Sequence, residues 1–365
     1  MKKVVILAND TTYTYNLRGA IIKALTKEKY KVYIVAKVLN FKKELENMGC
    51  KVIAMSINRH STNPFSDLKI LKEYKKILKS IQPDVVLSYN IKPNIYGGMI
   101  CSKYNIKFMP NITGLGTALE YPGLMQIITI TLNKIGLRKA NVVFFQNLEN
   151  ENFFVNKKIL SKNTKTILLP GSGVDLKQHK LLDYPKDDGI VRFLFIARIM
   201  KEKGIDIYLE TAKTIKEKYP NAEFHICGFC DDKKYKKILE EYEQEKIIFY
   251  HGEQENMIPF FKMANCIIHP SYYPEGMSNV LLEAAAHGRP IICTNRSGCR
   301  EIVDNTKTGF IAQIKNTDEI IKLVEKIIEM SNEDRKQMGL KGRKKIEKEF
   351  DRNIVVEKYM KVISE

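Results

Sequence analysis

Short apolar runs alternate with amphipathic stretches along almost the whole chain, and this plan occurs twice. In the first half, the strand-like runs cover residues 3–8, 31–36, 51–55, 84–89, 107–112, 141–146 and 165–169. In the second half, they cover approximately residues 191–197, 222–227, 246–251, 265–269, 290–294 and 309–312. Strands that alternate with helices predict parallel sheets covered by helices on both faces. The chain is therefore expected to form an α/β protein with two Rossmann-like, doubly wound domains that face a cleft.

The chain length of 365 residues also fits two domains better than one. Glycine, proline and paired aspartates gather in residues 171–189, which predicts a linker. We therefore expect a first domain over residues 1–170 and a second over residues 190–349. Residues 316–349 have the pattern of two charged helices, and residues 350–363 have that of a last helix.

The net charge of +18 is distributed very unevenly between the two halves. Residues 1–188 contain 30 Lys and Arg against 14 Asp and Glu, whereas residues 189–365 contain 30 against 28. Basic charge gathered in one domain predicts an anionic partner, either a membrane surface or a nucleic acid. The chain lacks an arginine-rich tail, an RNP-like aromatic motif and zinc-finger spacing, so we expect a membrane surface and no nucleic acid.

The N-terminal residues resemble the start of a signal peptide, but their apolar run is short and ends at Asn9 and Asp10. No stretch of 18 apolar residues occurs, so the sequence predicts no membrane-spanning helix. Seven scattered cysteines, an odd number, suggest a reducing compartment. Cys227 and Cys230 have the spacing of a redox or zinc pair, but no second pair with ligand spacing accompanies them. We expect them to flank a nucleotide-binding loop.

Residues 122–137 form an unusual helix candidate, because apolar side chains cover a wide arc of it. Lys134, Arg138 and Lys139 close its far end. One interpretation is a core helix of the first domain, which is the commoner case. The other is an interfacial helix that lies in a membrane surface, and the basic charge of the first domain favours it.

Residues 274–290 are the most informative stretch for function. Glu275 precedes a helical pattern and Glu283 lies inside it, about 12 Å further along a helix axis. Residues 276–279 would supply the free N–H groups of a helix N-terminus, which carries roughly +0.5 charge and binds phosphate. Strand-like runs on both sides place the motif at the carboxyl end of a parallel strand, where open α/β sheets bind ligands. This site fits a nucleotide-sugar, whereas the glutamate spacing alone is most often a solvated helix face.

Two cations stand on another loop of the same predicted domain. Arg198 and Lys203 follow the strand-like run 191–197 and precede the next helical pattern. Arginine makes bidentate contacts with phosphate, and lysine acts as a point charge. On their own these are two solvated loop cations, but together with residues 274–290 they indicate a phosphate site.

Together these stretches resemble the family-4 retaining glycosyltransferases of the GT-B fold. The resemblance covers nearly the whole chain and is most specific over residues 190–312. It rests on Arg198-x4-Lys203, Glu275-Gly-x6-Glu283, Gly288-Arg-Pro-Ile, Thr308-Gly-Phe and residues 169–175 (Leu-Pro-Gly-Ser-Gly-Val-Asp). The first half is similar to a narrower group that extends lipid-linked or capsular polysaccharides, through Asn63-Pro-Phe, Lys92-Pro-Asn, Thr113-Gly-Leu-Gly and Phe145-Gln-Asn.

This resemblance implies a retaining hexosyltransferase that uses a UDP-sugar carrying N-acetylhexosamine or another hexose. It assigns Arg198 and Lys203 to the leaving diphosphate. It assigns Glu275 to the donor sugar and Glu283 to the ribose. Further donor contacts are implied for Gly228, Phe229, Gly252, Met257, Gly276, Met277, Ser278, Asn279 and Val280. It also implies that the last helix, within residues 350–365, returns to pack on the first domain.

The acceptor that the resemblance implies is a polyprenyl-diphosphate-linked saccharide used to assemble bacterial surface glycans. Acceptor-side candidates are Thr113, Gly114 and Gly116, with Asn16 and Arg18 opening the first helix, while the loop at residues 9–15 lacks the Gly-Gly pair of many family members. No metal or other cofactor is expected, because Asp-x-Asp spacing occurs nowhere in the chain. We expect a cytoplasmic enzyme, attached peripherally to the inner face of the cell membrane through its basic first domain.

Alternatives from other classes stay open on the sequence alone. A UDP-sugar epimerase of the same fold, or a dinucleotide dehydrogenase, would also bind a nucleotide. The loop after the first strand-like run lacks Gly-x-Gly-x-x-Gly, which argues against the dehydrogenase. A non-catalytic protein that binds membrane or RNA would use the basic domain, but it leaves Arg198, Lys203, Glu275 and Glu283 unexplained.

Overall fold

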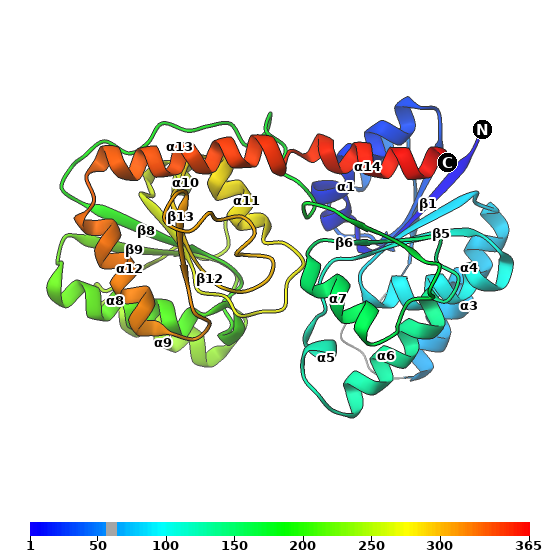
Figure 1. Ribbon diagram of the computed structural model, residues 1–365, viewed down its shortest axis with the longest axis horizontal. Coiled ribbons are helices and arrows are strands. Elements are labelled where there is room, and N and C mark those ends of the chain that lie inside the picture. Colours follow the sequence, from blue (N-terminus) through cyan, green and yellow to red (C-terminus); the bar gives the residue numbers. More distant parts are fainter. Residues whose placement is uncertain (56–63) are drawn as a thin grey trace. The chain divides into compact units, whose positions relative to one another are not determined.

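The computed structural model describes residues 1–55 and 64–365, so Asn63 of the Asn63-Pro-Phe motif lies outside the described residues. The chain divides into two compact units (Figure 1). The first unit comprises Met1–Ser172, Glu275–Met277 and Arg352–Glu365. The second unit comprises Gly173–Pro274 and Ser278–Asp351.

The first unit is built on a parallel sheet of seven strands with the order β3-β2-β1-β4-β5-β6-β7. The strands are β1 (Lys3–Asp10), β2 (Lys31–Lys37), β3 (Lys51–Ala54), β4 (Val85–Tyr89), β5 (Lys107–Ile112), β6 (Val142–Phe145) and β7 (Lys165–Leu168). The order reverses between β1 and β4, as in doubly wound nucleotide-binding folds. Alternate residues of each strand point to opposite faces, so Val5 and Leu7 enter one core and Val4 and Ile6 enter the other.

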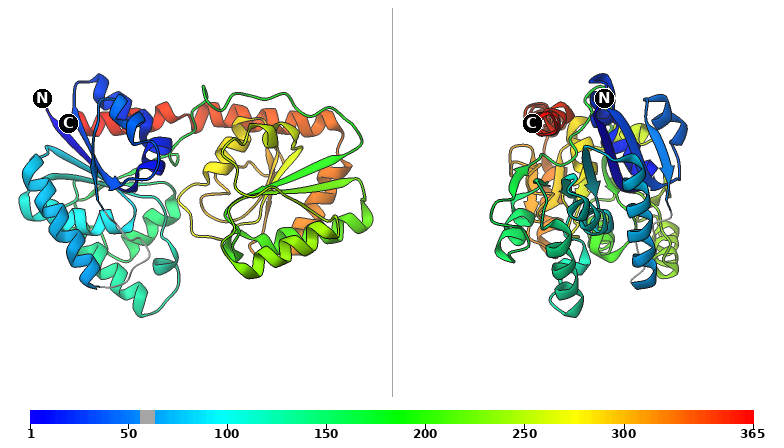
Figure 2. Two further views of the ribbon diagram at one scale, coloured as in Figure 1. Left: turned by 180° about the vertical axis from the view of Figure 1, so that it is seen from behind. Right: turned by 90° about the vertical axis from the view of Figure 1, so that its right-hand side faces the viewer.

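Helices cover both faces of this first sheet (Figures 1 and 2). One face carries α3 (Pro64–Ile81), the π-helix η1 (Pro93–Gly97), α4 (Gly98–Tyr104), α5 (Thr117–Glu120), α6 (Leu124–Leu137) and α7 (Leu148–Asn156). The other face carries α1 (Thr11–Lys27), α2 (Lys42–Asn47) and the C-terminal α14 (Arg352–Ser364). Helix α14 is fixed there by its buried Tyr359, whose hydroxyl accepts a hydrogen bond from Asn111 Nδ2 at 2.6 Å.

The second unit repeats the plan with six parallel strands in the order β10-β9-β8-β11-β12-β13. They are β8 (Val191–Ile196), β9 (Ala222–Cys227), β10 (Phe249–Tyr250), β11 (Cys266–His269), β12 (Ile291–Thr294) and β13 (Gly309–Ala312). Helices α8 (Ile205–Lys218), α9 (Lys233–Gln244) and α12 (Thr317–Glu329) contribute to the core on one face. Helices α10 (Ile258–Met263), α11 (Asn279–Ala286) and α13 (Asn332–Glu349) lie on the other (Figure 1).

Every strand-like run of the sequence forms a strand, and the expected fold class of two parallel-sheet α/β domains is confirmed. The start of α1 differs from the expectation, because the helix begins at Thr11 and includes most of the predicted loop 9–15. Asp10 caps the helix, since its Oδ1 accepts a hydrogen bond from the N–H of Tyr13 at 2.8 Å. This cap offsets the weak helix propensity of threonine. Asn16 and Arg18 therefore lie in the second turn of α1 and do not open it.

Part of the predicted linker is fastened to the second unit by a buried arginine. Arg289 is fully buried, and its guanidinium donates to the carbonyl oxygens of Asp183 at 2.6 Å and Phe261 at 2.7 Å. Burial lowers the pKa of Arg289 to about 10. This value is still well above neutral pH, so the side chain remains charged. The Arg289 charge thus joins residue 183 of the linker to helix α10.

We expect Arg289→Met to lower the free energy of unfolding by about 3 kcal/mol, because the substitution leaves buried carbonyl groups without their donor. Chemical unfolding followed by circular dichroism measures the change. Lys218→Met is the control, because Lys218 makes an exposed ion pair with Glu325 and its loss should leave stability nearly unchanged. An equal effect of the two substitutions would contradict the anchoring role of Arg289.

Candidate functional site

The candidate donor site lies at the reversal of strand order in the second unit. Strands β8 and β11 are neighbours in the sheet, but α8 and α11, which follow them, cover opposite faces. The loops after the two strands therefore diverge at the carboxyl edge of the sheet. In open α/β sheets, ligands bind at this position.

The two loops are held together by backbone contacts. The N–H of Tyr272 donates to the carbonyl oxygen of Glu202 at 2.9 Å. Gly204 has a φ of 80°, and a Cβ atom on it would overlap the carbonyl oxygen of Pro270. Glycine is required here by both its backbone conformation and the close approach of the second loop. This contact positions the 3-10 turn η2 (Lys201–Lys203), which ends in the candidate lysine.

The two predicted cations have different environments on the loop after β8. Arg198 is exposed, and its Nη2 lies 3.1 Å from Sδ of Met200. Lys203 is half-buried, and its Nζ lies 5.0 Å from the centroid of the Tyr273 ring. A cation over an aromatic face is attracted to the ring, which restricts its position. The lysine is thus the better positioned of the two charges, and Arg198 is the more accessible.

Helix α11 presents its N-terminus on the second loop. The N–H of Ser278 donates to the carbonyl oxygen of Gly298 at 2.8 Å, and the N–H of Leu282 donates to Ser278 at 3.1 Å. The three intervening amides, from Asn279 to Leu281, therefore belong to the first turn, whose N–H groups have no partner inside the helix. The prediction that residues 276–279 supply these groups is wrong for residues 276–278, because the helix begins only at Asn279 and the Ser278 N–H is already bonded. Such amides and the helix dipole attract an anion. Glu283 is half-buried on the same helix, one turn further on.

The residues predicted to contact the nucleoside end of the donor lie on the loops after β9 and β10. The N–H of Gly228 donates to the carbonyl oxygen of Gly252 at 2.8 Å, which joins these loops. A Cβ atom on Gly228 would overlap the carbonyl oxygen of Ala197, so the β9 loop also lies directly against the β8 loop. The Phe229 side chain is 47 % exposed. Met257 is half-buried and precedes α10.

A second set of predicted residues gathers in the first unit. Glu275–Met277 belongs to this unit, where Asn147 Nδ2 donates to the carbonyl oxygens of Gly276 at 2.6 Å and Glu275 at 3.2 Å. Asn147 also caps α7 through its Oδ1. Thr113, Gly114 and Gly116 form the loop after β5, and the Thr113 carbonyl lies against Gly276.

The two candidates on α1 have unlike surroundings. Asn16 is exposed. Arg18 is buried, with Nη1 donating to Ser172 Oγ at 3.0 Å and its guanidinium 4.2 Å from the centre of the Tyr89 ring. These contacts favour a positioning role for Arg18 over direct contact with an acceptor.

The structure divides the predicted residues into two sets, one in each unit. Arg198, Lys203, Gly228, Phe229, Gly252, Met257, Ser278, Asn279, Val280 and Glu283 belong to the second unit. Sequence reasoning did not predict the contact of Lys203 with the Tyr273 ring, and it named Asn147 only within the Phe145-Gln-Asn motif, without its contact to Glu275. The sequence features that could have indicated these contacts are the Tyr-Tyr pair before Pro274 and the asparagines at positions 147 and 150.

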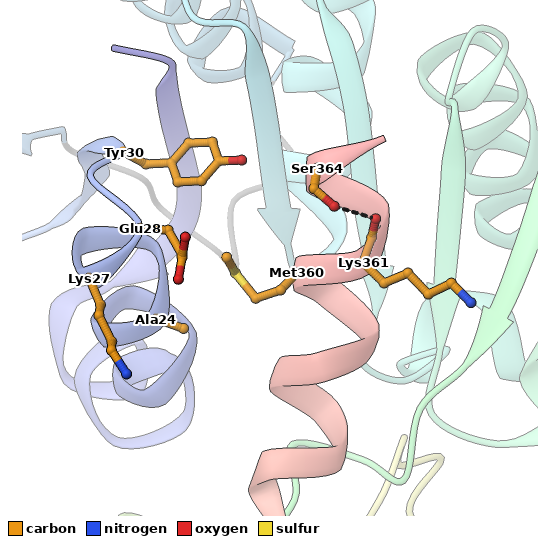
Figure 3. Close-up of a pocket in the computed structure, with 7 residues that line it drawn as sticks. All are labelled: Ala24, Lys27, Glu28, Tyr30, Met360, Lys361 and Ser364. Carbon is orange, nitrogen blue, oxygen red and sulfur yellow. Dashed lines mark hydrogen bonds between the residues drawn. The ribbon is translucent and has the colours of Figure 1, made fainter.

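Cys227 and Cys230 are free and buried, and burial raises the pKa of Cys227 to about 12, so it is a thiol at neutral pH. Among the residues that the structure describes, no group of three His, Cys, Asp or Glu side chains is placed to hold a metal ion. A cavity of about 470 Å³ between α1 and α14 is lined by Lys27, Glu28, Tyr30 and Met360, among others (Figure 3). Tyr30 directly precedes β2, so this cavity lies at the amino edge of the first sheet, away from the edge where ligands bind.

Two Rossmann-type units with these loops define the class of GT-B proteins. The family model for glycosyl transferases group 1 matches residues 179–345, and that for glycosyl transferase 4-like proteins matches residues 3–147. The chain belongs to these glycosyltransferases, and it is therefore an enzyme. This result removes the alternative of a non-catalytic binding protein.

Two curated relatives agree with this membership, and a solved structure has the same fold. The N,N'-diacetylbacillosaminyl-diphospho-undecaprenol alpha-1,3-N-acetylgalactosaminyltransferase of Campylobacter jejuni is 26% identical over 99% of this chain and 98% of its own length. The capsular polysaccharide biosynthesis glycosyltransferase CapM of Staphylococcus aureus is 26% identical over 93% of this chain and 91% of its own. The crystal structure of Anabaena HepE in complex with UDP and glucose aligns with a TM-score of 0.78 and 14% identity over 100% of both chains.

A pair of histidines on β9 and on the loop after β10 predicts that the stability of the protein depends on pH. His225 Nδ1 lies 3.0 Å from Nε2 of His251, the residue before Gly252. Burial lowers the pKa of His225 from 6.5 to about 4, although Glu223 raises it to a smaller extent. The unfolded chain therefore binds a proton near pH 6.5 that the folded protein excludes, so stability falls as the pH drops from 6.5 towards 4.

We expect His225→Gln to reduce this loss. Between pH 7 and pH 4.5, the wild type should lose more free energy of unfolding than the variant, by on the order of 2 kcal/mol. Urea unfolding at both pH values measures the difference. Parallel losses in the two proteins would show that His225 does not exclude the proton.

Proposed function

We propose that this enzyme transfers a sugar from a UDP-sugar to a polyprenyl-diphosphate-linked saccharide, with retention of anomeric configuration. Two comparisons support the substrates: the Campylobacter relative is named for transfer to a diphospho-undecaprenol sugar, and HepE was solved with UDP and glucose. N-acetylhexosamine or another hexose is the transferred group. The product would enter the assembly of a bacterial surface polysaccharide.

The observation that carries the proposal is the meeting of the β8 and β11 loops in the second unit. That meeting brings a cation loop and a helix N-terminus to the ligand-binding edge of one sheet. When the bond to the sugar breaks, negative charge develops on the β-phosphate of UDP. Arg198, Lys203 and the α11 amides would stabilise that charge, and preorganised donors of this kind are often the largest catalytic contribution.

Glu283 on α11 follows from the same placement and would accept hydrogen bonds from the ribose hydroxyls. For Glu275, which belongs to the first unit, the role of holding hydroxyls of the donor sugar rests on the family resemblance. The exposed ring of Phe229, with the Gly252 and Met257 loop, would contact the uracil. The scheme has no metal requirement, because cations and amides neutralise the diphosphate.

The first unit would carry the acceptor. Asn16 and the loop of Thr113, Gly114 and Gly116 are the acceptor-side candidates, with Arg18 in support. A lipid-linked acceptor would require the enzyme to act at the inner face of the cell membrane, from the cytoplasm, where the basic first unit would hold it. No nucleic acid takes part.

A UDP-sugar epimerase of the same fold is the alternative outcome. It would convert a UDP-sugar without releasing UDP and without an acceptor. A screen of UDP-sugars for UDP release in the presence of membrane extract separates the two. UDP release that depends on the extract supports the transferase.

We expect Arg198→Ala and Lys203→Ala each to lower kcat at least about tenfold, because each removes charge from the leaving group, and typical losses are roughly 10²–10³. UDP release under saturating donor measures the rate. Lys201→Ala is the matched control, since Lys201 is an exposed cation of the same loop and should retain activity. Wild-type turnover in both variants would exclude the leaving-group role.

Glu283→Ala should weaken UDP binding by about 10- to 100-fold, the range expected for lost hydrogen bonds to a charged group. Isothermal titration calorimetry with UDP measures the affinity. Glu210→Ala, on the exposed face of α8, is the control and should bind UDP as the wild type does. If Glu283→Ala also kept the wild-type affinity, the ribose contact would have to be abandoned.

A further inference from the structure

Helix α6 packs Leu137, Ile130 and Leu132 against the core of the first unit, but it exposes a second apolar stripe and buries two polar side chains. Leu124, Ile127, Ile128 and Ile135 are 74, 61, 43 and 50 % exposed. Their spacing along the helix places them on one stripe. On the opposite side, Thr129, Asn133, Gly136 and Leu137 are the buried residues. A helix that served only as a core element would bury its largest apolar residues.

The buried side of α6 packs through small residues. A Cβ atom on Gly136 would lie 2.7 Å from the backbone of Ile95, and one on Gly98 would overlap the carbonyl oxygen of Gly136. The buried polar groups bond within the helix: Thr129 Oγ1 donates to the Met125 carbonyl at 2.8 Å, and Asn133 Nδ2 donates to the Thr129 carbonyl at 2.8 Å. This close backbone contact fixes which side of α6 faces the core and leaves the apolar stripe on the outside.

The charged side chains on α6 and directly after it are all cations. No acidic residue occurs between Glu120 and Glu149. Lys134, Arg138 and Lys139 are exposed at the C-terminal end of α6. Figure 1 shows α5 and α6 at one edge of the first unit, on the other side of the sheet from α1 and α14. An apolar stripe with a cationic end complements a lipid surface that is apolar inside and anionic outside.

We propose that the exposed face of α6 inserts into the interfacial layer of an anionic membrane, with Lys134, Arg138 and Lys139 among the headgroups. The helix has 14 residues and is about 21 Å long, which suits a helix lying in the surface. None of the described helices is long and apolar enough to cross a membrane. A second copy that paired in parallel through this face would bring the like-charged ends near each other, whereas an anionic membrane complements them.

This inference deepens the proposed function, since a lipid-linked acceptor would lie in the same membrane, but it rests on α6 itself. The test is sedimentation of the full chain with sucrose-loaded vesicles of phosphatidylcholine, with or without phosphatidylglycerol. Leu124→Ser/Ile128→Ser should reduce binding to the anionic vesicles at least about tenfold, because exposed apolar carbons no longer partition. Val155→Ser, at a 53 % exposed position on α7 of the same unit, is the control and should bind as the wild type does.

A charge series separates the two contributions. Replacing Lys134, Arg138 and Lys139 by Gln, one at a time, should reduce binding to the anionic vesicles by about fivefold each. The same variants should bind the neutral vesicles as the wild type does. A wild type that sediments equally with both vesicle types would overturn the role of the cations.

Two outcomes would overturn the whole inference. The first is vesicle binding by Leu124→Ser/Ile128→Ser at the wild-type level. The second is a concentration-dependent dimer in analytical ultracentrifugation that this double variant abolishes, which would assign the face to a second copy. UDP titration of the same variants keeps the proposals apart, because lost vesicle binding with intact UDP affinity supports the α6 assignment independently of the donor site.

Discussion

The contact between Gly204 and the carbonyl group of Pro270 determines what the second unit can bind. It joins the loop after β8 to the loop after β11, and these loops carry the candidate cations and the N-terminus of α11. A residue with a side chain could not adopt the left-handed backbone at 204 without strain and would also displace the second loop. The donor site is therefore specified first by backbone packing and only then by charge.

Most of the sheet architecture could be predicted because its signal is local. Each strand of both sheets is a short apolar run between helical stretches, so the parallel α/β class follows from the pattern of the residues alone. The start of α1 could not be predicted in the same way. Thr11 and Thr12 are poor helix formers, and the cap bond from Asp10 to Tyr13 is a feature of the folded chain.

In the candidate site, too, local features could be predicted and long-range contacts could not. Arg198, Lys203 and Glu283 could be identified as site candidates from the sequence. Each stands just after a strand-like run or within the helical pattern beside it. The environment of each residue could not be predicted from the sequence, because it depends on contacts between distant segments. The Tyr273 ring near Lys203 and the burial of Arg18 against Tyr89 are examples. The orientation of α6 is another, because a helix that is apolar over a wide arc does not reveal which arc faces the core.

The central claim is that the second unit holds the donor diphosphate with side-chain cations and backbone amides alone. The most direct test is a crystal structure determined after crystals of the enzyme have been soaked with UDP in a buffer free of divalent ions. The account predicts the diphosphate at the first turn of α11, within contact distance of Lys203 or Arg198. Nucleotide bound elsewhere in the chain, or held only when a divalent ion is supplied, would contradict it.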